Sequence, residues 1–413
     1  MSPEEAERYL LSLELFGMRF GLDRMRRLMT ALGHPERAFD SIHVVGTNGK
    51  SSTVRMIAAI LAHHGLRTGA YLSPHLVSFT ERIRIADADL EPRAFAGAVT
   101  RAARAAELVD RSLGPEDRVT QFEALTAAAY WELARAEVEV AVIEAGLGGR
   151  YDATNVIPSR VQVLTGIGLE HTRWLGPTIE DIATEKLDVV KPQGTLVLGA
   201  RLHPDAAVQA ERVAAQRGAR IVRAGNDPGV AVGAPGLFQR RNFALACAAA
   251  EAYLGRLKPE AVRAAAREVR VPGRLQQIDD RPLTLLDGAH NPDGIDALAE
   301  SAPELRQGRE PLVGVVSILD DKDAAAMLAR LSGICDALIL TSSQNLRALP
   351  PPTLKSLIRQ LDGPPAEVVP APRAAVARAR ELAGAGGIVL VTGSIYLVAD
   401  LLARPGARRA SML

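Results

Sequence analysis

The sequence predicts an α/β protein of two domains, each with a mostly parallel sheet that helices cover on both faces. Apolar runs of strand length alternate with helical patterns along most of the 413 residues. Near the start, a strand pattern, a glycine-rich turn and a helical pattern follow one another directly over residues 42–61. The alternation stops at residues 270–274, which contain proline and glycine, and then restarts. We therefore expect a first domain of residues 1–270 and a smaller second domain of residues 271–413.

The first domain is predicted to open with helix in its first 40 residues, where apolar side chains recur at helical spacing, as at Met25, Leu28 and Met29. The strand before the glycine-rich turn follows. Further strands are predicted at residues 138–143, 161–164 and 195–198, and helices at residues 91–110, 122–136 and 178–190. This order is typical of crossover connections, which join parallel strands through a helix.

The second domain repeats the pattern on a smaller scale and predicts a Rossmann-like α/β unit. Its strands are predicted at residues 283–286, 312–316, 337–340, 367–369 and 388–391, with helical patterns between them. Residues 349–352 (LPPP) are predicted to form a loop, because proline cannot donate a backbone hydrogen bond.

Composition excludes several classes of protein. A hydrophobic content of 47% supports large buried cores and argues against a disordered chain. The 49 basic and 48 acidic residues nearly cancel, so neither a nucleic-acid nor a membrane partner is indicated. Cys247 and Cys335 have no disulfide or metal-site spacing and are expected to be reduced core thiols. Because the N-terminus lacks a signal-like apolar stretch and no run of about 18 apolar residues occurs, we expect a cytoplasmic protein.

The turn at Gly46–Ser51 (GTNGKS) predicts a phosphate-binding loop. Its glycines would let the backbone approach a polyphosphate, and the amides at the start of the next helix would face the negative charge. Lys50 would add a mobile cation, and Ser51 a hydroxyl for magnesium. The full P-loop pattern has four residues between its glycines and this turn has two, so a surface turn that caps a helix is the alternative. The flanking strand and helix favour a P-loop, and ATP rather than a nicotinamide.

A second glycine-rich segment follows Glu144, at the end of a predicted strand. Ligands of open α/β sheets bind at the carboxyl ends of the strands, and a carboxylate there suits magnesium. The alternative is a turn whose glutamate faces solvent. The glycines that lie beside Arg150 and Asp152 favour a functional loop.

A third segment, residues 168–186, carries His171 and Lys186. Thr178 and Asp181 have the spacing of a capping box that begins a helix. Taken alone, His171 fits a hydrogen-bonded structural histidine and Lys186 fits a solvated helical lysine.

Together these segments resemble the Mur ligase superfamily, and more specifically its bacterial dihydrofolate synthase and folylpolyglutamate synthase branch. The matching segments, in chain order, are residues 46–51 (GTNGKS), 71–76 (YLSPHL), 79–83 (FTERI), 144–155 (EAGLGGRYDATN), 287–292 (DGAHNP) and 392–394 (TGS). The resemblance covers nearly the whole chain. It implies an N-terminal P-loop ATPase-like domain and a C-terminal glutamate-ligase domain.

The resemblance also implies a nucleotide and metal site. The residues implied to bind ATP are Thr47, Asn48, Gly49, Lys50, Ser51, Asn242, Arg274 and Asp287, the last three from the linker and second-domain side. The residues implied to bind one magnesium ion are Ser73, Glu144 and His171, and Lys186 is implied to bind a second. Lys186 would be carbamylated by carbon dioxide, which turns a cation that repels magnesium into an anionic oxygen ligand.

A substrate pocket and catalytic residues are implied in the same way. The residues implied to line a pteroate pocket are Thr120, Gln121, Phe122, Tyr151, Asp152 and Ala153. The implied catalytic residues are Lys50, Lys186 and His290, with Asn291 close by.

The implied activity is ATP-dependent, ADP-forming ligation of L-glutamate to dihydropteroate, to folates or to both, within folate biosynthesis and one-carbon metabolism. A carboxylate is a poor acyl donor, and transfer of the ATP γ-phosphoryl group to it would create an acyl phosphate that the glutamate amine can attack. The expected partners are a pteroate or folate and L-glutamate, and the chain is expected to act as a monomer. The sequence leaves open which of the two ligations it performs.

Three other functions would each need a feature that this sequence lacks. A peptidoglycan-type Mur ligase normally carries a further domain before its P-loop, and only 45 residues precede Gly46 here. A non-enzymatic nucleotide-binding switch of the GTPase type would need a guanine-reading Asn-Lys-x-Asp string, which the sequence lacks. A dinucleotide-binding protein would carry Gly-x-Gly-x-x-Gly after the first strand, where this chain has Lys50.

Overall fold

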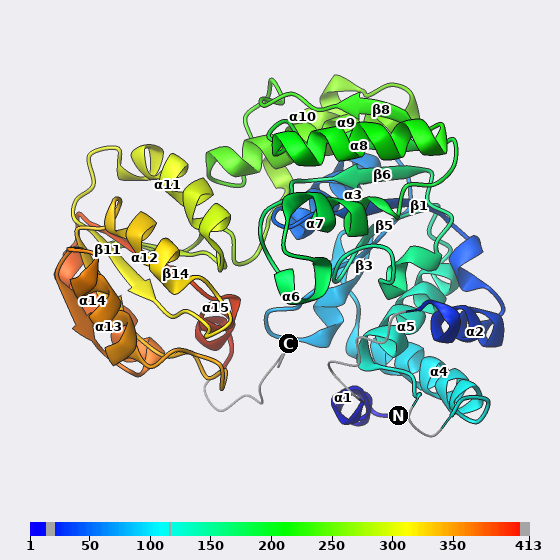
Figure 1. Cartoon of the computed structure of the whole chain (residues 1–413), viewed down its shortest axis with the longest axis horizontal. Coiled ribbons are helices and arrows are strands. Elements are labelled where there is room, and N and C mark those ends of the chain that lie inside the picture. The colour runs from blue at the N-terminus through cyan, green and yellow to red at the C-terminus, as the bar shows by residue number, and fades with distance from the viewer. Residues whose placement is uncertain (14–20, 115–116, 405–413) are drawn as a thin grey trace. The chain divides into compact units, whose positions relative to one another are not determined.

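The computed structural model describes residues 1–13, 21–114 and 117–404 (Figure 1). These residues form two compact units. Of the described residues, the first unit comprises those within Met1–Gly233 and Arg240–Val269, and the second comprises Ala234–Gln239 and residues 270–404. Each unit has its own sheet of mostly parallel strands, so the predicted α/β class is confirmed.

The sheet of the first unit has eight strands in the order β4-β3-β2-β5-β1-β6-β7-β8. Their bounds are β1 (Asp40–Val45), β2 (Thr68–Tyr71), β3 (Ile83–Ile85), β4 (Ala88–Asp89), β5 (Val140–Glu144), β6 (Val161–Leu164), β7 (Thr195–Leu198) and β8 (Arg220–Arg223). Among the described strands of this sheet, the antiparallel pairs are β2 with β3 and β3 with β4, at one edge.

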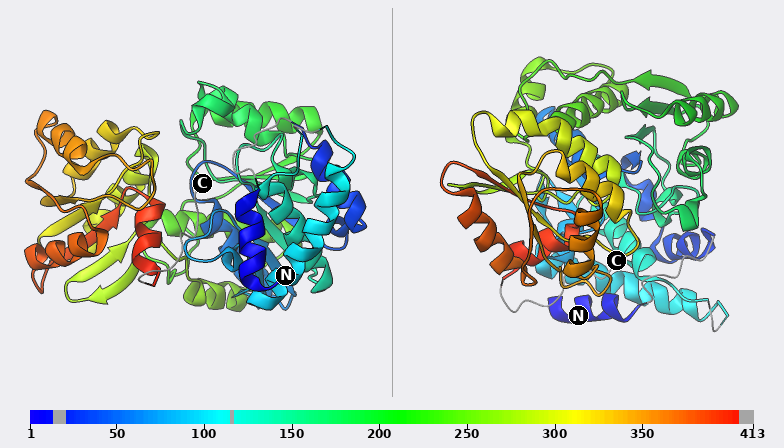
Figure 2. Two further views of the ribbon diagram at one scale, coloured as in Figure 1. Left: turned by 90° about the horizontal axis from the view of Figure 1, so that it is seen from below. Right: turned by 60° about the vertical axis from the view of Figure 1, so that its left-hand side comes forward.

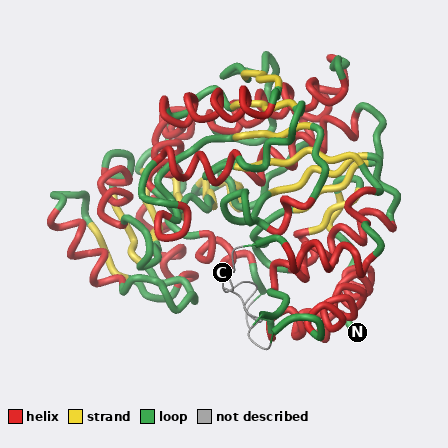
Figure 3. The backbone as a smooth tube through the Cα atoms, turned by 45° about the vertical axis from the view of Figure 1, so that its right-hand side comes forward, coloured by secondary structure: helices red, strands yellow, loops and turns green. Residues whose placement is uncertain are grey.

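Helices lie on both sides of these strands, as the red and yellow tube in Figure 3 shows. The helices that lie wholly or mainly in the first unit are α1 (Pro3–Ser12), α2 (Asp23–Leu32), α3 (Lys50–His63), α4 (Pro92–Asp110), α5 (Gln121–Arg135), α6 (Thr172–Leu175), α7 (Ile179–Leu187), α8 (Pro204–Arg217), α9 (Leu237–Leu254) and α10 (Pro259–Glu268). Short 3₁₀ turns occur at η1 (Pro35–Arg37), η2 (Phe79–Arg82) and η3 (Ala153–Val156). The capping box expected at Thr178 and Asp181 is present at the start of α7.

Both faces of the sheet are apolar because helices pack on both of them. All five residues of β5 are buried, as expected of a central parallel strand with helices on both sides. Ala141 and Ile143 share a core with α4 and α5. Because side chains alternate along a strand, Val140 and Val142 point to the opposite face, on which α3 packs.

The strand order creates a topological switch point in the first unit. From β1 the chain crosses through α3 to β2, on one side of β1, whereas from β5 it continues to β6, on the other side. β1 and β5 are neighbours in register, with Val44 paired to Glu144. In open α/β sheets the crevice for ligands forms at the carboxyl ends of such strands. The loops after β1, β5, β2 and β6 therefore meet at one edge.

The second unit, most of which runs from yellow to red in Figure 2, contains a sheet. That sheet has six strands in the order β13-β12-β11-β14-β10-β9. Its elements are β9 (Gln276–Asp280), β10 (Leu283–Leu286), α11 (Pro292–Arg306), β11 (Leu312–Val316), α12 (Ala324–Ser332), β12 (Ala337–Leu340), α13 (Pro351–Gln360), β13 (Ala366–Val368), α14 (Pro372–Ala383), β14 (Ile388–Thr392) and α15 (Ile395–Leu402). Helices α11, α12 and α13 share one core with strand residues. Among the described strands of this sheet, the antiparallel pair is β9 with β10.

The proline-rich stretch is a correction to the sequence prediction. Residues 349–352 were predicted to be a loop, but α13 begins at Pro351, with Pro350 as its N-cap. Proline is well suited to the first turn of a helix, because the N–H that it lacks would have no partner inside the helix there.

Two smaller expectations can be compared with the fold. Cys335 is buried and Cys247 is half-buried, and neither forms a disulfide. Among the helices of the described residues, none combines the length and apolar character needed to cross a bilayer.

Candidate active site

The turn after β1 has the backbone of a phosphate-binding loop. Gly46 and Gly49 both have positive φ, and α3 begins at Lys50 directly after them. The Lys50 ammonium donates to the carbonyl oxygen of Thr47 at 3.1 Å, so it folds back over the turn. The first amides of α3 and this cation can therefore face a bound phosphate together.

The loop that follows β6 holds this turn in place. The Thr165 hydroxyl, just after β6, donates to the carbonyl oxygen of Asn48 at 2.6 Å. The amide of Gly168 donates to the Thr47 hydroxyl at 3.1 Å. A Cβ added at Gly46 would lie 1.9 Å from the Thr165 hydroxyl oxygen, so only glycine fits there.

Gly49→Ala is expected to weaken ATP binding. The φ of Gly49 is +82°, and an added Cβ would lie 2.8 Å from the Asn242 side-chain oxygen, so both the turn and Asn242 must shift. The matched control is Gly65→Ala, because Gly65 has a φ of +92° but open space around its Cβ position. Both variants should lose about 1–2 kcal/mol of stability from the left-handed backbone. Only Gly49→Ala should raise the KM for ATP, and an equal rise in both variants would contradict the proposed role of the turn.

Glu144 lies at the centre of an oxygen-rich cluster. Its carboxylate is 1% exposed and accepts a hydrogen bond from the Ser51 hydroxyl at 2.9 Å and another from the Ser73 amide at 3.1 Å. Ser51 follows β1, Glu144 is the last residue of β5 and Ser73 follows β2, so the carboxyl edge of the sheet brings them together. Carboxylate and hydroxyl oxygens are the ligands that magnesium prefers.

His171 stands on the loop after β6. It is exposed and is the N-cap of α6, with a φ of +55°. Gly168, three residues earlier, bonds to Thr47, so the His171 backbone lies within about 11 Å of the P-loop. Within the described residues, no three His, Cys, Asp or Glu side chains gather as a ready metal site. A metal here would need hydroxyl or phosphate oxygens in addition to Glu144.

Lys186 is buried beside the P-loop. Its side chain comes from the last turn of α7, and its ammonium donates to the carbonyl oxygen of Gly46 at 2.9 Å. Burial, assisted by the nearby charge of Lys50, lowers the pKa of Lys186 to about 7. A substantial fraction of this amine is therefore neutral near pH 7, and a neutral amine is nucleophilic.

The start of α5 contains three of the residues implied to line the substrate pocket. Thr120 is the N-cap of α5 and forms a capping box with Glu123. Gln121 is buried, and its amide donates to the carbonyl oxygen of Leu10, which ties α1 to α5. The Phe122 ring lies where a side chain at Gly146 would be, 2.6 Å from its notional Cβ. Phe122 therefore packs directly on the loop that follows Glu144.

That loop also carries the other three. Tyr151 is exposed, with the Arg150 guanidinium 5.9 Å from its ring centre. Asp152 is buried and accepts hydrogen bonds from the amides of Leu147 and Thr154 at 2.8 and 3.0 Å. Burial raises the pKa of Asp152, and these hydrogen bonds oppose the rise. Ala153 is buried at the start of η3.

Arg274, Asp287 and His290 form a second cluster, at the carboxyl end of β10 in the second unit. The Asp287 carboxylate accepts from the amides of Leu275 and Ala289, at 2.9 and 2.8 Å. Burial raises the pKa of Asp287, while the charge of Arg274 lowers it. The Nδ1 of His290 is 2.9 Å from the carbonyl oxygen of Gly288. Asn291 is the N-cap of α11.

Asn242 belongs to the first unit. It is on α9 against Gly49, as its contact with the notional Cβ of that glycine shows. The structure thus groups Asn242 with the P-loop.

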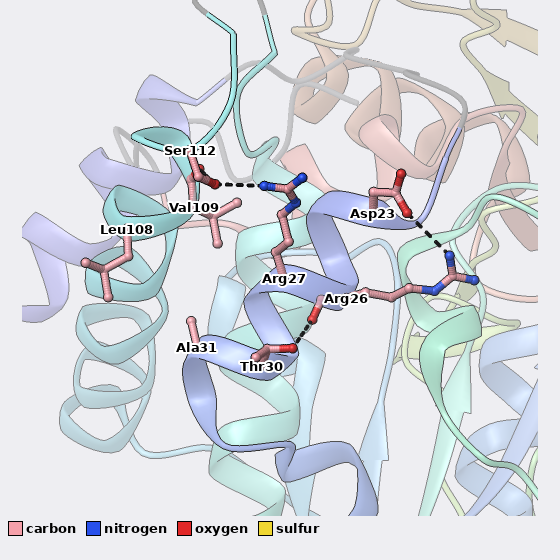
Figure 4. A pocket seen from close by; sticks show the side chains of 8 residues that line it. All are labelled: Asp23, Arg26, Arg27, Thr30, Ala31, Leu108, Val109 and Ser112. Atoms are coloured by element: carbon pink, nitrogen blue, oxygen red, sulfur yellow. Dashed lines mark hydrogen bonds and ion pairs between the residues drawn. The ribbon is translucent and has the colours of Figure 1, made fainter.

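A separate pocket lies between α2 and α4 (Figure 4). It is lined by Asp23, Arg26, Arg27, Thr30, Ala31, Leu108, Val109 and Ser112. Its two arginines bond within the pocket: Arg27 donates to Ser112 at 3.0 Å, and Arg26 to Asp23 at 3.4 Å. None of the residues implied by the sequence lines it, so the carboxyl edge of the sheet remains the candidate site.

Sequence reasoning missed the residues that hold the loops. Thr165 and Gly168 fix the P-loop, and Thr154 contacts Asp152. Thr154 and Gly168 lie within segments that the sequence singles out, but no role is expected there for any of the three. The one available signal was position, because Thr165 directly follows the predicted strand of residues 161–164.

Comparisons with known proteins identify relatives of the whole chain. The Mur ligase middle domain matches residues 44–228, and the Mur ligase glutamate ligase domain matches residues 273–395. The chain is 32% identical to the dihydrofolate synthase/folylpolyglutamate synthase of Bacillus subtilis, over 94% of this chain and 96% of that protein.

Solved structures show the same fold. Mycobacterium tuberculosis folylpolyglutamate synthase complexed with ADP matches with a TM-score of 0.89 and 32% identity. Escherichia coli FolC in complex with DHPP and ADP matches with a TM-score of 0.86 and 28% identity. The bifunctional folylpolyglutamate synthase/dihydrofolate synthase of Yersinia pestis, complexed with AMPPNP and a manganese ion, has a TM-score of 0.85 and 30% identity. Each match covers 97% of both chains.

Proposed function

Because this chain belongs to the dihydrofolate synthase/folylpolyglutamate synthase family of Mur ligases and is an ATP-dependent ligase of glutamate to pteroates or folates, we propose that ATP phosphorylates the acid substrate at the carboxyl edge of its first sheet. One observation carries this proposal. The P-loop, the Glu144 carboxylate and the buried Lys186 amine adjoin one another at the switch point between β1 and β5.

The first step is phosphoryl transfer. An oxygen of the substrate carboxylate forms a bond to the γ-phosphorus of ATP as the bond from that phosphorus to the β-phosphate oxygen breaks, which releases ADP. Lys50 and the amides at the start of α3 stabilise the charge on the phosphate oxygens. The product is an acyl phosphate.

The second step is amide formation. The amine of glutamate attacks the acyl carbon, inorganic phosphate leaves, and the amine nitrogen loses a proton. We propose His290 as a catalytic residue in this half of the reaction. A carbonyl oxygen can only accept, so Nδ1 of His290 carries the proton that bonds to Gly288, and Nε2 is the nitrogen that can take up another.

The residues at the edge of the sheet fit a divalent metal. Ser51, Ser73 and Glu144 offer hard oxygen atoms, and His171 suits manganese better than magnesium. The related Yersinia pestis structure contains manganese. A bound metal would neutralise charge on the transferring phosphoryl group. We propose that Ser73, Glu144 and His171 hold one metal ion and that Lys186 is a ligand of a second.

Lys186 is proposed to act as a carbamate. Its neutral amine attacks carbon dioxide, a C–N bond forms and one proton is released, which leaves an anionic oxygen donor. The supporting observations are the burial of Lys186 and its lowered pKa beside Lys50. A protonated lysine at this place would repel both the metal and Lys50.

The remaining expectations are part of the same proposal. We propose residues 1–270 as the ATP-binding domain and residues 271–413 as the glutamate-ligase domain, with Asn242, Arg274 and Asp287 as further ATP contacts. The substrate pocket is proposed to be lined by Thr120, Gln121, Phe122, Tyr151, Asp152 and Ala153. We also propose a cytoplasmic monomer, and light scattering of the eluted protein tests the monomer.

One assay tests the function and separates its two forms. ADP release is measured with dihydropteroate and with tetrahydrofolate, each with and without L-glutamate. Release that requires ATP, a divalent metal, the acid and glutamate together supports the proposal. Turnover with dihydropteroate but not with tetrahydrofolate indicates a dihydrofolate synthase. Turnover with tetrahydrofolate but not with dihydropteroate indicates a folylpolyglutamate synthase, and turnover with both acids indicates a bifunctional enzyme. Turnover with a UDP-muramyl acid but with neither pteroate nor folate would reject the proposal that a pteroate or folate is the substrate.

A further inference from the structure

The buried histidine His43 has no role in the mechanism above. It lies in β1, three residues before Gly46, and its side chain is 0% exposed. Its Nε2 is 2.9 Å from the hydroxyl oxygen of Thr154, which is also 0% exposed. A polar ring in the middle of a central strand is costly to bury, so the contact that it makes is informative.

Thr154 links His43 to Asp152. The Thr154 hydroxyl donates to one oxygen of the Asp152 carboxylate in a very short contact, and the Thr154 amide donates to the same oxygen at 3.0 Å. The Leu147 amide donates to the other oxygen at 2.8 Å. Both oxygens of Asp152 are thus fixed by the loop, and Thr154 is the residue that reaches back to β1.

The number of available protons determines the direction of the hydrogen bonds from His43 through Thr154 to Asp152. A hydroxyl has one proton, and that of Thr154 goes to Asp152, so His43 must donate through Nε2–H and Thr154 must accept. His43 is therefore the neutral tautomer with the proton on Nε2. Burial lowers the pKa of His43 to about 3, which keeps the ring neutral. Its Nδ1 is buried without a hydrogen-bond partner.

Other groups also hold the turn that carries Thr154. The Tyr130 hydroxyl, from α5, donates to the carbonyl oxygen of Thr154 at 3.0 Å. The Lys191 ammonium donates to the backbone and side-chain oxygens of Asn155, at 3.1 and 2.9 Å. The turn that carries Thr154 is therefore fixed from β1, from α5 and from the segment after α7.

We propose that Thr154 and His43 are positioning residues for Asp152: they hold its carboxylate in one orientation toward the pteroate or folate and join that orientation to the strand that carries the P-loop. This inference rests on the proposed place of Asp152 in the substrate pocket. An ionised carboxylate only accepts hydrogen bonds, so a fixed Asp152 selects N–H groups of the acid substrate. Neither positioning residue touches substrate.

Paired substitutions test the two positions. Thr154→Val removes the hydroxyl and keeps the shape, and it should raise the KM for the acid substrate about tenfold while the KM for ATP changes less than about twofold. Thr154→Ser keeps the hydroxyl, so its KM for the acid substrate should stay close to that of the unsubstituted enzyme. His43→Leu should raise the same KM by a smaller factor, because Thr154 can still donate to Asp152. His43→Gln, which keeps an N–H donor, should restore it.

The control is Thr284→Val in the second unit. Thr284 is also 0% exposed, and its hydroxyl donates to the carbonyl oxygen of Pro282 at 3.0 Å. It should lose stability without changing either KM. Equal changes in the KM for ATP and for the acid, or a Thr154→Ser variant that behaves like Thr154→Val, would overturn the proposal.

A measurement on the unsubstituted protein avoids any problem of folding. Long-range ¹H–¹⁵N NMR correlations of the His43 ring should show a protonated Nε2 and a bare Nδ1. A protonated Nδ1 would contradict this hydrogen-bond arrangement, because Thr154 would then have to donate to His43 instead of Asp152. This readout does not depend on activity, so it separates a failure of the positioning chain from a failure of the proposed function.

Discussion

Lys50→Ala is expected to lower the rate of ADP formation by about 10²–10³-fold and to leave the melting temperature nearly unchanged. Lys50 is half-buried at the first position of α3, and its ammonium folds back over the P-loop turn to Thr47. In phosphoryl transfer, catalysis depends on positioning and on charge stabilisation, so loss of this cation removes transition-state stabilisation. Steady-state ADP release measures the effect.

The control for this variant is Lys258→Ala. Lys258 is exposed and precedes α10, so the substitution also removes one lysine charge but does so away from the P-loop. Its rate should match that of the unsubstituted enzyme. If Lys50→Ala kept more than about a tenth of the rate, the phosphate contact assigned to Lys50 would be wrong.

Lys186→Ala is expected to reduce turnover by a similar factor, because it removes the proposed carbamate oxygen donor. Added formate or acetate should restore part of the rate by occupying the vacated space with a carboxylate. Lys186→Arg should stay inactive, since it keeps a cation but cannot form the carbamate. Near-normal activity in Lys186→Ala would reject the carbamate.

The unsubstituted enzyme gives a second test of Lys186. Its pKa of about 7 lies well below the usual value for lysine, so the neutral amine dominates above pH 7 and the ammonium below it. Activity in buffer depleted of carbon dioxide should fall with time, fall faster below pH 7, and return when bicarbonate is added. Activity that does not respond to carbon dioxide at any pH would contradict the proposal.

The regular strands of the fold could be predicted because their chemistry is local. Val161–Leu164 and Thr195–Leu198 are buried central strands made of apolar runs, and the structure places β6 and β7 at these bounds. The edge strands carried no such signal. Gln276–Asp280 (QQIDD) and Arg220–Arg223 (RIVR) are polar, and their strand structure depends on pairing with a neighbour.

The grouping of the candidate site was predictable for a related reason. Parallel strands end at one edge, so the loops after Val45, Glu144 and Leu164 had to lie on the same edge once a parallel sheet was predicted, and the strand order β5-β1-β6 makes them neighbours. The contact between Ser51 and Glu144 follows from that geometry.

Contacts that depend on strand register were out of reach. The bond from Thr165 to Asn48 requires that Val45 pair with Leu164, and the bond from His43 to Thr154 requires the turn of η3 to lie over β1. Nothing in the local sequence fixes those alignments. The contacts nevertheless decide how firmly the P-loop and Asp152 are held.

The central claim is that ATP converts the substrate carboxylate into an acyl phosphate at the P-loop. The most direct test is to label both carboxylate oxygens of the pteroate or folate with ¹⁸O and to analyse the products by mass spectrometry. The account predicts one ¹⁸O atom in each inorganic phosphate released and none in the nucleotide. Unlabelled phosphate, or ¹⁸O recovered in AMP, would contradict it.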